Sequence, residues 1–170
     1  AACARINRNA LGSLWTNGGY VEDFNINVGF LKTAGYDFGA NYAYDLGDMG
    51  GLSFNFVGTL LDKFESSNGG DCLGQFGSTR CGVPAPEWRH RFRVGYDTPW
   101  GIDVAATWRY IGEVDYEGGA RALDGQFDAE NYFDLFASWK ATDNASFRAG
   151  VNNVFDNDPP LSRSVGTTGN

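Results

Sequence analysis

Three cysteines are the residues whose spacing most directly suggests chemistry in this sequence. Cys72 and Cys81 enclose the segment CLGQFGSTRC, which is rich in Gly, Ser and Thr. Eight intervening residues are more than the C-x₂₋₄-C spacing of zinc sites allows. The spacing therefore favours a disulfide that closes a small loop in an oxidising compartment. Cys3 is then either a free thiol or the partner of a cysteine further upstream.

Residues that could support catalysis or hold a metal ion are scarce. His90 is the only histidine, and it alternates in phase with Trp88 and Phe92, which favours a position at a rim or interface over a general base. The segment DNDPP, residues 156–160, lacks the D-x-D-x-D-G pattern and the distant Glu of a calcium loop. A turn that ends a strand is the favoured interpretation. We therefore expect neither an enzyme nor a cofactor.

Charged residues form two sets that could contact a ligand. One set consists of residues on the polar sides of alternating segments, namely Arg89, Arg91, Arg93, Asp103, Arg109 and Arg148. These arginines either pair with acids of neighbouring strands, for example Asp103, or form a charged wall that guides anions. The other set is Glu113, Asp115 and Glu117, at the start of a Gly-rich segment. A solvated loop is the preferred interpretation, and contact with cationic ligand groups is the alternative.

Composition restricts the class of protein. The 170 residues allow one domain or a part of a larger one, and a content of 15% aromatic residues with 24 Gly suits strands and turns. A net charge of −8 argues against nucleic acid as a partner. A run of about 18 apolar residues, as a membrane-spanning helix would need, does not occur. Transmembrane strands leave a weaker trace, because only alternate residues need be apolar.

Alternation of apolar and polar residues is the main structural pattern. In GIDVAATWRY, residues 101–110, one face carries Ile102, Val104 and Trp108, while Asp103 and Arg109 fall on the other. The same pattern predicts six strands, at residues 24–44, 51–65, 86–98, 101–114, 129–141 and 145–155.

Connectors between these strands alternate in length. Short turns are expected at residues 45–51, 97–101 and 141–145, and long, strand-poor, Gly-rich segments at 66–85, 114–128 and from 156 onward. Short turns at one end and long loops at the other are typical of antiparallel up-and-down membrane barrels. Soluble sandwiches and lipocalin-like barrels are the alternative. Strands longer than the usual five or six residues, with aromatics near their ends, favour the membrane barrel.

One segment resembles a known family. ASFRAGVNNVFDNDPP, residues 145–160, is similar to the late-strand segment of TonB-dependent outer-membrane receptors, which has an x-G-V-x-N-L-F-D-x-x-P-P-like run. The matching positions are Gly150, Val151, Asn152, Asn153, Val154, Phe155, Asp156, Pro159 and Pro160. Residues 31–47 and 86–112 resemble earlier strands and hairpins of the same family.

The resemblance implies an all-β, antiparallel, up-and-down transmembrane barrel, of which this chain supplies about six strands out of roughly 22. Residues 1–170 are then the C-terminal part of one barrel domain, lacking the plug domain, the energy-coupling box and the closing strand. The six strands correspond to the sixteenth through twenty-first. The arginine set and Asp103 would face the lumen or plug, and the loops at 66–85 and 114–128, with Glu113, Asp115 and Glu117, would contact ligand.

The function implied by the resemblance is that of a bacterial outer-membrane receptor with its long loops outside the cell. Such a receptor takes up a scarce nutrient, namely an iron chelate, cobalamin or an oligosaccharide. The partners implied are outer-membrane lipid, the plug domain and missing strands, the TonB energy-coupling complex and a small-molecule or oligosaccharide ligand. A passive porin-like or structural barrel is the first alternative, and a soluble secreted β-sheet binding module is the second.

Overall fold

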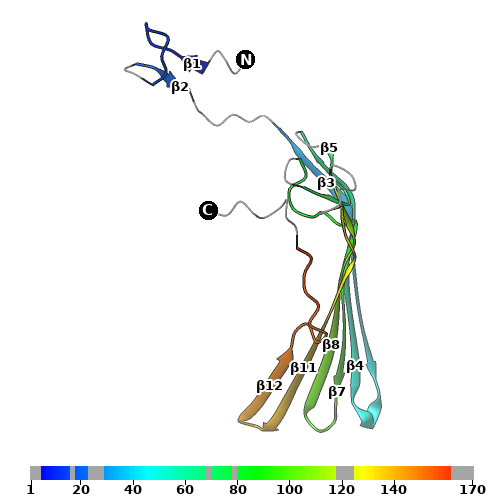
Figure 1. Ribbon diagram of the computed structural model, residues 1–170. Helices are drawn as coiled ribbons and strands as arrows, with labels where there is room; N and C mark the ends of the chain where they lie inside the picture. Colours follow the sequence, from blue (N-terminus) through cyan, green and yellow to red (C-terminus); the bar gives the residue numbers. More distant parts are fainter. Residues whose placement is uncertain are drawn as a thin grey trace.

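Six long strands form one antiparallel sheet in the computed structural model, which describes residues 5–15, 18–22, 29–67, 70–77, 80–117 and 125–161 (Figure 1). These strands are β3 (Leu31–Asp45), β4 (Gly51–Ser66), β7 (Trp88–Asp97), β8 (Ile102–Ile111), β11 (Glu130–Thr142) and β12 (Ala145–Val151). Their order in the sheet is β12-β11-β8-β7-β4-β3, so each long strand pairs with its neighbour in the sequence. The predicted up-and-down arrangement is confirmed.

The register sorts the side chains into an apolar and a polar face. One row across four strands contains Phe54, Val94, Ala106 and Leu135, and the adjacent row contains Asn55, Arg93, Thr107 and Asp134. Because successive side chains of a strand point to opposite sides, this phase holds along the sheet. We call the side of Val94 the apolar face and the side of Arg93 the polar face. The predicted alternation is therefore confirmed.

The apolar face is largely uncovered by the described part of the chain. Tyr36, Leu135 and Phe147 are 61%, 51% and 61% exposed, although all three belong to this face. A contiguous apolar surface of this kind marks contact with lipid or another protein. The described residues contain no helix that is long and apolar enough to cross a membrane.

Three short turns connect the strands at one end of the sheet. The first contains a 3₁₀ helix, η2 (Gly47–Met49), and the others lie between β7 and β8 and between β11 and β12. Gly50 has a φ of 98°, and a Cβ at this position would collide with the carbonyl oxygen of Asp97, the last residue of β7. Only glycine therefore fits where this turn meets the end of β7. The predicted short turns are confirmed.

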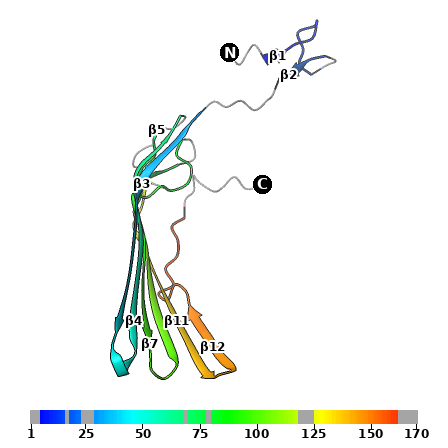
Figure 2. The ribbon, with the colours of Figure 1, turned by 180° about the vertical axis from the view of Figure 1, so that it is seen from behind.

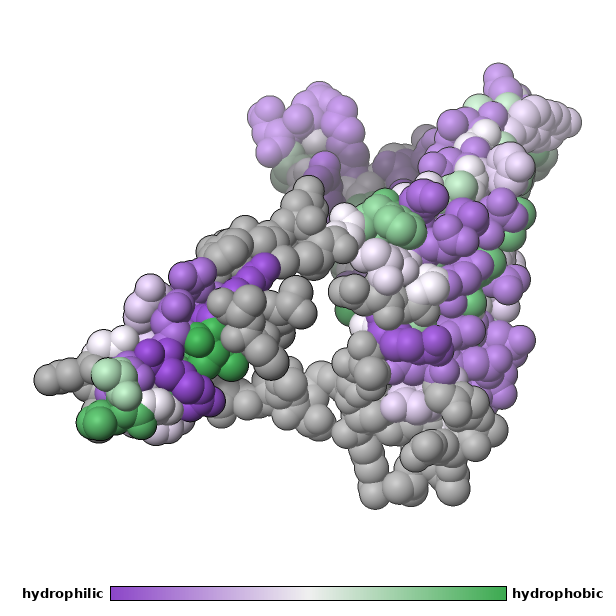
Figure 3. Space-filling view, turned by 90° about the horizontal axis from the view of Figure 1, so that it is seen from above, coloured by the Kyte–Doolittle hydropathy of each residue, from purple (hydrophilic) through white to green (hydrophobic). Residues whose placement is uncertain are grey.

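The long connections at the other end contain short strands of their own, contrary to the expectation that they are strand-poor (Figure 1, Figure 2). β5 (Gly70–Asp71) pairs with β4, and β6 (Gln75–Phe76), β9 (Val114–Tyr116) and β10 (Gln126–Phe127) form a three-stranded sheet. We call the described residues 70–77, 80–87, 112–117 and 125–129 the loop unit. Viewed from this end, most of the described surface is hydrophilic (Figure 3).

The loop unit contains most of the core found among the described residues. Of the six buried hydrophobic residues there, five belong to the loop unit: Cys72, Phe76, Cys81, Ala85 and Val114. The ring of Phe76 is fully buried and stacks on Phe127 at 4.1 Å between centroids, while Tyr116 meets it edge-on at 5.6 Å. The two long loops therefore pack against each other.

Several predicted strand limits were wrong. Gly29 and Phe30 precede β3 and are not in a strand, while residues 23–28 of the predicted 24–44 strand lie outside the described residues. β7 begins at Trp88, because Pro84 and Pro86 cannot donate to a strand ladder. β12 ends at Val151 because Asn153 and Asp156 have φ values of 53° and 54°. A further two-stranded sheet joins β1 (Ile6–Asn7) and β2 (Tyr20–Val21).

Candidate functional site

All of the predicted arginines lie on the polar face. Arg91 of β7 is directly opposite Arg109 of β8, with Arg89 and Arg93 on either side of Arg91 along the strand. Arg148 of β12 lies opposite Ser138 of β11. Two like charges directly opposite each other destabilise a strand pair unless other groups compensate. The polar face thus concentrates positive charge along β7 and β8.

Asp134 of β11 is the carboxylate that compensates one of these arginines. The Arg109 Nε and Nη2 groups donate to its two carboxylate oxygens at 2.8 and 2.9 Å, a bidentate geometry. The backbone N–H of Asn153 donates to the same carboxylate at 2.9 Å. Asp134 was not among the predicted site residues, although its place in the alternation of β11 puts it on the polar face.

Asp103, which the sequence suggested as an arginine partner, occupies a different part of the polar face. It lies opposite Asp97 near a short turn, and it accepts a hydrogen bond from the Ser138 hydroxyl at 3.0 Å. The register moves it away from Arg89, Arg91, Arg93 and Arg109, which lie toward the loop end of β7 and β8, while Ser138 of β11 stands between it and Arg148 of β12. The expected pairing with Asp103 is therefore wrong.

Several arginines of the polar face form no ion pair with any residue that the structure describes. These are Arg89, Arg91, Arg93 and Arg148. The guanidinium of Arg93 lies 5.8 Å from the centroid of the Phe136 ring, a cation–π distance. The polar face therefore presents guanidinium groups that are available to an anionic partner.

The segment NVFDN, residues 153–157, closes on itself and attaches to β11. The Asn153 side chain exchanges two hydrogen bonds with the backbone of Asn157, at 3.0 and 3.1 Å. The Val154 N–H donates to the Phe133 carbonyl at 2.7 Å, and the Asn157 side-chain amide donates to the Asn131 carbonyl at 2.8 Å. This segment is a hydrogen-bonded turn, in agreement with the favoured interpretation of DNDPP.

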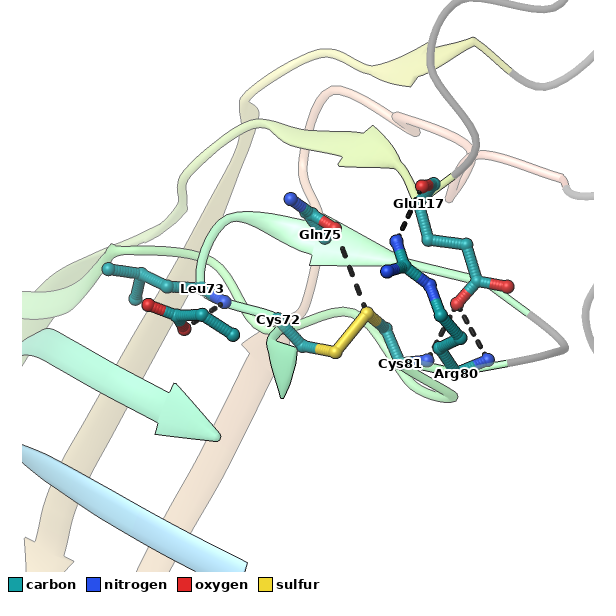
Figure 4. Close-up of a disulfide and its surroundings, with 7 residues drawn as sticks. Cys72, Leu73, Gln75, Arg80, Cys81 and Glu117 are labelled. Atoms are coloured by element: carbon teal, nitrogen blue, oxygen red, sulfur yellow. Dashed lines mark hydrogen bonds between the residues drawn. A yellow bond between two sulfur atoms is a disulfide. The ribbon is translucent and has the colours of Figure 1, made fainter. Parts of the chain in front are cut away.

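The predicted disulfide between Cys72 and Cys81 is present, with the two Cα atoms 5.4 Å apart. Glu117, from the other long loop, binds the chain beside this disulfide. One of its carboxylate oxygens accepts hydrogen bonds from the backbone N–H groups of Arg80 and Cys81, at 2.8 and 2.6 Å (Figure 4). The Arg80 guanidinium donates in turn to the Glu117 carbonyl at 2.8 Å. We call these contacts the Glu117 clamp. Cys3 lies outside the described residues.

The acidic trio does not converge on one point. Glu117 holds the clamp, the Gln126 side-chain amide approaches Glu113 at 3.4 Å, and Asp115 pairs through its backbone with Gln126 and Gln75. Within the described ranges, no three His, Cys, Asp or Glu residues are grouped so as to hold a metal ion. The sequence analysis predicted neither the Glu117 clamp nor the Phe76 stack. The one available signal of a buried loop was Phe76 itself, an aromatic residue between two cysteines.

Replacing both Cys72 and Cys81 by serine is expected to loosen the loop unit without unfolding the long sheet. A disulfide that closes a loop of this size contributes about 2–3 kcal/mol by restricting the unfolded chain. Trypsin should therefore cleave after Arg80 several-fold faster in the double variant, and dithiothreitol should accelerate cleavage of the wild type alone. Equal cleavage of the oxidised and reduced wild type would contradict this prediction.

A comparison with protein families gives one result. The model of the family described as "TonB dependent receptor-like, beta-barrel" matches residues 5–154. No curated protein and no solved structure matches the chain significantly. The matched region includes all of the long strands and the loop unit, and it ends within the turn at residues 153–157.

The family accounts for both faces of the sheet. Receptors of this family lie in the bacterial outer membrane, where lipid covers an apolar barrel exterior and polar residues face the interior. The match spans most of the chain, and the resemblance at residues 145–160 agrees with it. The chain therefore belongs to the TonB-dependent receptor family, within its β-barrel domain.

Proposed function

We propose that this chain is part of the barrel wall of a receptor that actively takes up a scarce nutrient across the outer membrane. Iron chelates, cobalamin and oligosaccharides are the nutrient classes that the resemblance implies. In this proposal a plug domain fills the barrel, and an inner-membrane energy-coupling complex drives transport. The observation that carries the proposal is the polar face, where Arg89, Arg91 and Arg93 form no ion pair with any described residue and so suit a polar partner inside the barrel.

The sheet edges support a larger barrel. Among the described long strands, β3 and β12 each have a long-strand neighbour on one side only. An unpaired strand edge in lipid leaves N–H and C=O groups without partners, which costs several kcal/mol for each group. We propose that further strands pair with β3 and β12 and complete a barrel of about 22 strands. The polar face then lines the interior.

The two ends of the sheet suit opposite sides of the membrane. Barrels of the outer membrane have short turns toward the periplasm and long loops outside the cell. We therefore assign the loop unit to the cell exterior, which agrees with its disulfide because extracellular compartments are oxidising. In this orientation the side chains of Glu113 and Asp115 can contact ligand, whereas Glu117 serves mainly to join the two loops.

Energy-dependent uptake tests the proposed function. Cells that produce the full-length protein are expected to accumulate a labelled nutrient saturably, and removal of the energy-coupling complex should abolish the accumulation. The three nutrient classes can be screened in parallel, with cells lacking the protein as the control. Uptake that persists without the energy-coupling complex, together with ion conductance in planar bilayers, would instead identify a passive porin-like barrel.

A further inference from the structure

A cavity of about 270 Å³ opens on the polar face at the loop end of the sheet. Its walls are Thr59, Leu61 and Phe64 of β4 together with Arg89 of β7, and the segment 83–86 of the loop unit covers it. Thr33 of β3 completes the lining. The cavity therefore lies between the polar face and the loop unit, where a ligand would pass from one to the other.

An irregularity in β4 shapes the apolar wall of this cavity. Gly35 pairs with Leu61, but the preceding residue Ala34 pairs with Lys63, so one extra residue is inserted in β4. A bulge of this kind shifts the phase of the following side chains. It brings Phe64, opposite Thr33, to the same face as Leu61 and Thr59. Strict alternation would have placed Phe64 on the apolar face.

The cover of the cavity is held by backbone hydrogen bonds. The Ala85 N–H donates to the Gln75 carbonyl at 3.1 Å, and the Ala85 carbonyl accepts the Gly74 N–H at 2.8 Å. The Glu87 carbonyl accepts the Leu61 N–H at 2.8 Å, which ties the end of the cover to β4. Ala85 itself is 7% exposed. Backbone hydrogen bonds therefore hold this wall of the cavity in position.

Arg89 is the only charged residue among those that line the cavity. Its side chain is exposed and forms neither a hydrogen bond nor an ion pair with the described residues. Thr59, directly opposite, donates its hydroxyl to one carboxylate oxygen of Asp37 at 2.7 Å, and Asp37 does not line the cavity. Arg91, two residues further along β7, adds positive charge on the same face. The local field therefore favours an anion.

We propose that this cavity binds a small ligand that has a carboxylate or phosphate group beside a compact apolar part. The Arg89 guanidinium offers a planar fork of N–H donors, which matches either anion in a bidentate geometry. Leu61, Phe64 and Pro86 supply an apolar surface for the rest of the ligand. The inference rests on the proposed function, since it names the chemical class of group that the receptor recognises as a nutrient enters the barrel.

Calorimetry on the full-length receptor in lipid nanodiscs tests the proposal with defined probes. Phenyl phosphate and benzoate are the anionic probes and separate the two anion types; benzylamine and benzyl alcohol are the cationic and neutral controls. We expect Arg89→Gln to weaken binding of the preferred anion about 10-fold or more, because a hydrogen bond to a charged group is worth about 1.5–3 kcal/mol. Lys140→Gln, which removes a positive charge at the short-turn end of the sheet, should leave binding unchanged.

Three results would overturn the proposal. They are no binding of either anion to the wild type, equal anion binding by the wild type and Arg89→Gln, and benzylamine binding as tight as that of the anions. Heat-modifiable migration of each variant shows that its barrel is folded. If Arg89→Gln does not fold, Arg89→Lys replaces it, since this variant keeps the positive charge but loses the planar set of N–H donors. An anion affinity of Arg89→Lys equal to that of the wild type overturns the proposal as well. Binding in nanodiscs needs no energy coupling, so this test and the uptake test fail independently.

Discussion

Replacing Phe76 by alanine is expected to unfold the loop unit while the long sheet stays assembled. The Phe76 ring is fully buried, and its stack on Phe127 joins the two long loops. Removing a buried phenyl ring costs about 3–5 kcal/mol. The loop unit has a small core, so a loss of this size exceeds what its remaining contacts can offset. The long sheet keeps its own ladders and should not respond.

Limited proteolysis of the full-length receptor measures this effect. Trypsin should cleave after Arg80 at least 10-fold faster in the Phe76→Ala variant, while heat-modifiable migration of the barrel stays the same. Val83→Ala is the matched control, because Val83 belongs to the same loop and is 70% exposed. Under the proposed function, nutrient uptake should fall with Phe76→Ala as well. A wild-type rate of cleavage in Phe76→Ala would contradict the prediction.

The second large effect is expected at Asp134. Replacing Asp134 by alanine removes the carboxylate that binds Arg109, which lies directly opposite the like-charged Arg91. It also removes the acceptor of the Asn153 N–H. The Asp134 side chain is 18% exposed, so solvent compensates only in part. We expect the barrel to lose about 2–3 kcal/mol of stability, since bonds to a charged group contribute about 1.5–3 kcal/mol.

A double-mutant cycle isolates the Arg109–Asp134 interaction. Urea unfolding of the full-length receptor in lipid vesicles gives the stability of Asp134→Ala, Arg109→Gln and the double variant. The double variant should lose at least 1 kcal/mol less than the sum of the single losses, because residues in direct contact are coupled. Asp103→Ala, which removes a single exposed bond to Ser138, is the control and should cost about 0.5 kcal/mol or less. Additive losses would show that the pair is not coupled.

The long sheet could be predicted because its signals are local. The alternation at residues 101–110 determines which side chains share a face, and turn residues such as Gly50 mark where the strands end. Both signals are read within a few residues of the position they describe. The predicted faces of Arg89, Arg91, Arg93, Arg109 and Arg148 follow from alternation alone, and the structure has all of them on the polar face.

The missed features depend on contacts between distant segments. Asp134 meets Arg109 because of the relative register of β8 and β11, and the register of β7 and β8 places Asp103 opposite Asp97 instead of an arginine. No single strand encodes either register. The two- and three-residue strands of the loop unit are too short to show alternation, and they form because Phe76 packs on Phe127. The end of β12 at Val151 results from the left-handed conformation of Asn153, which its side-chain bonds to Asn157 stabilise.

The Glu117 clamp has a mechanical consequence. The disulfide is confined to one long loop, whereas the contacts that join this loop to the other are noncovalent: the Glu117 clamp, the Phe76 stack and the pairing of β6 with β9. The two loops start from different hairpins, β4–β7 and β8–β11. While the clamp is intact, a force applied to either loop is transmitted to both hairpins, so the two loops move as one rigid body. Since every contact between the loops is noncovalent, the two loops can separate without reduction of the disulfide once the clamp, the stack and the β6–β9 pairing are broken.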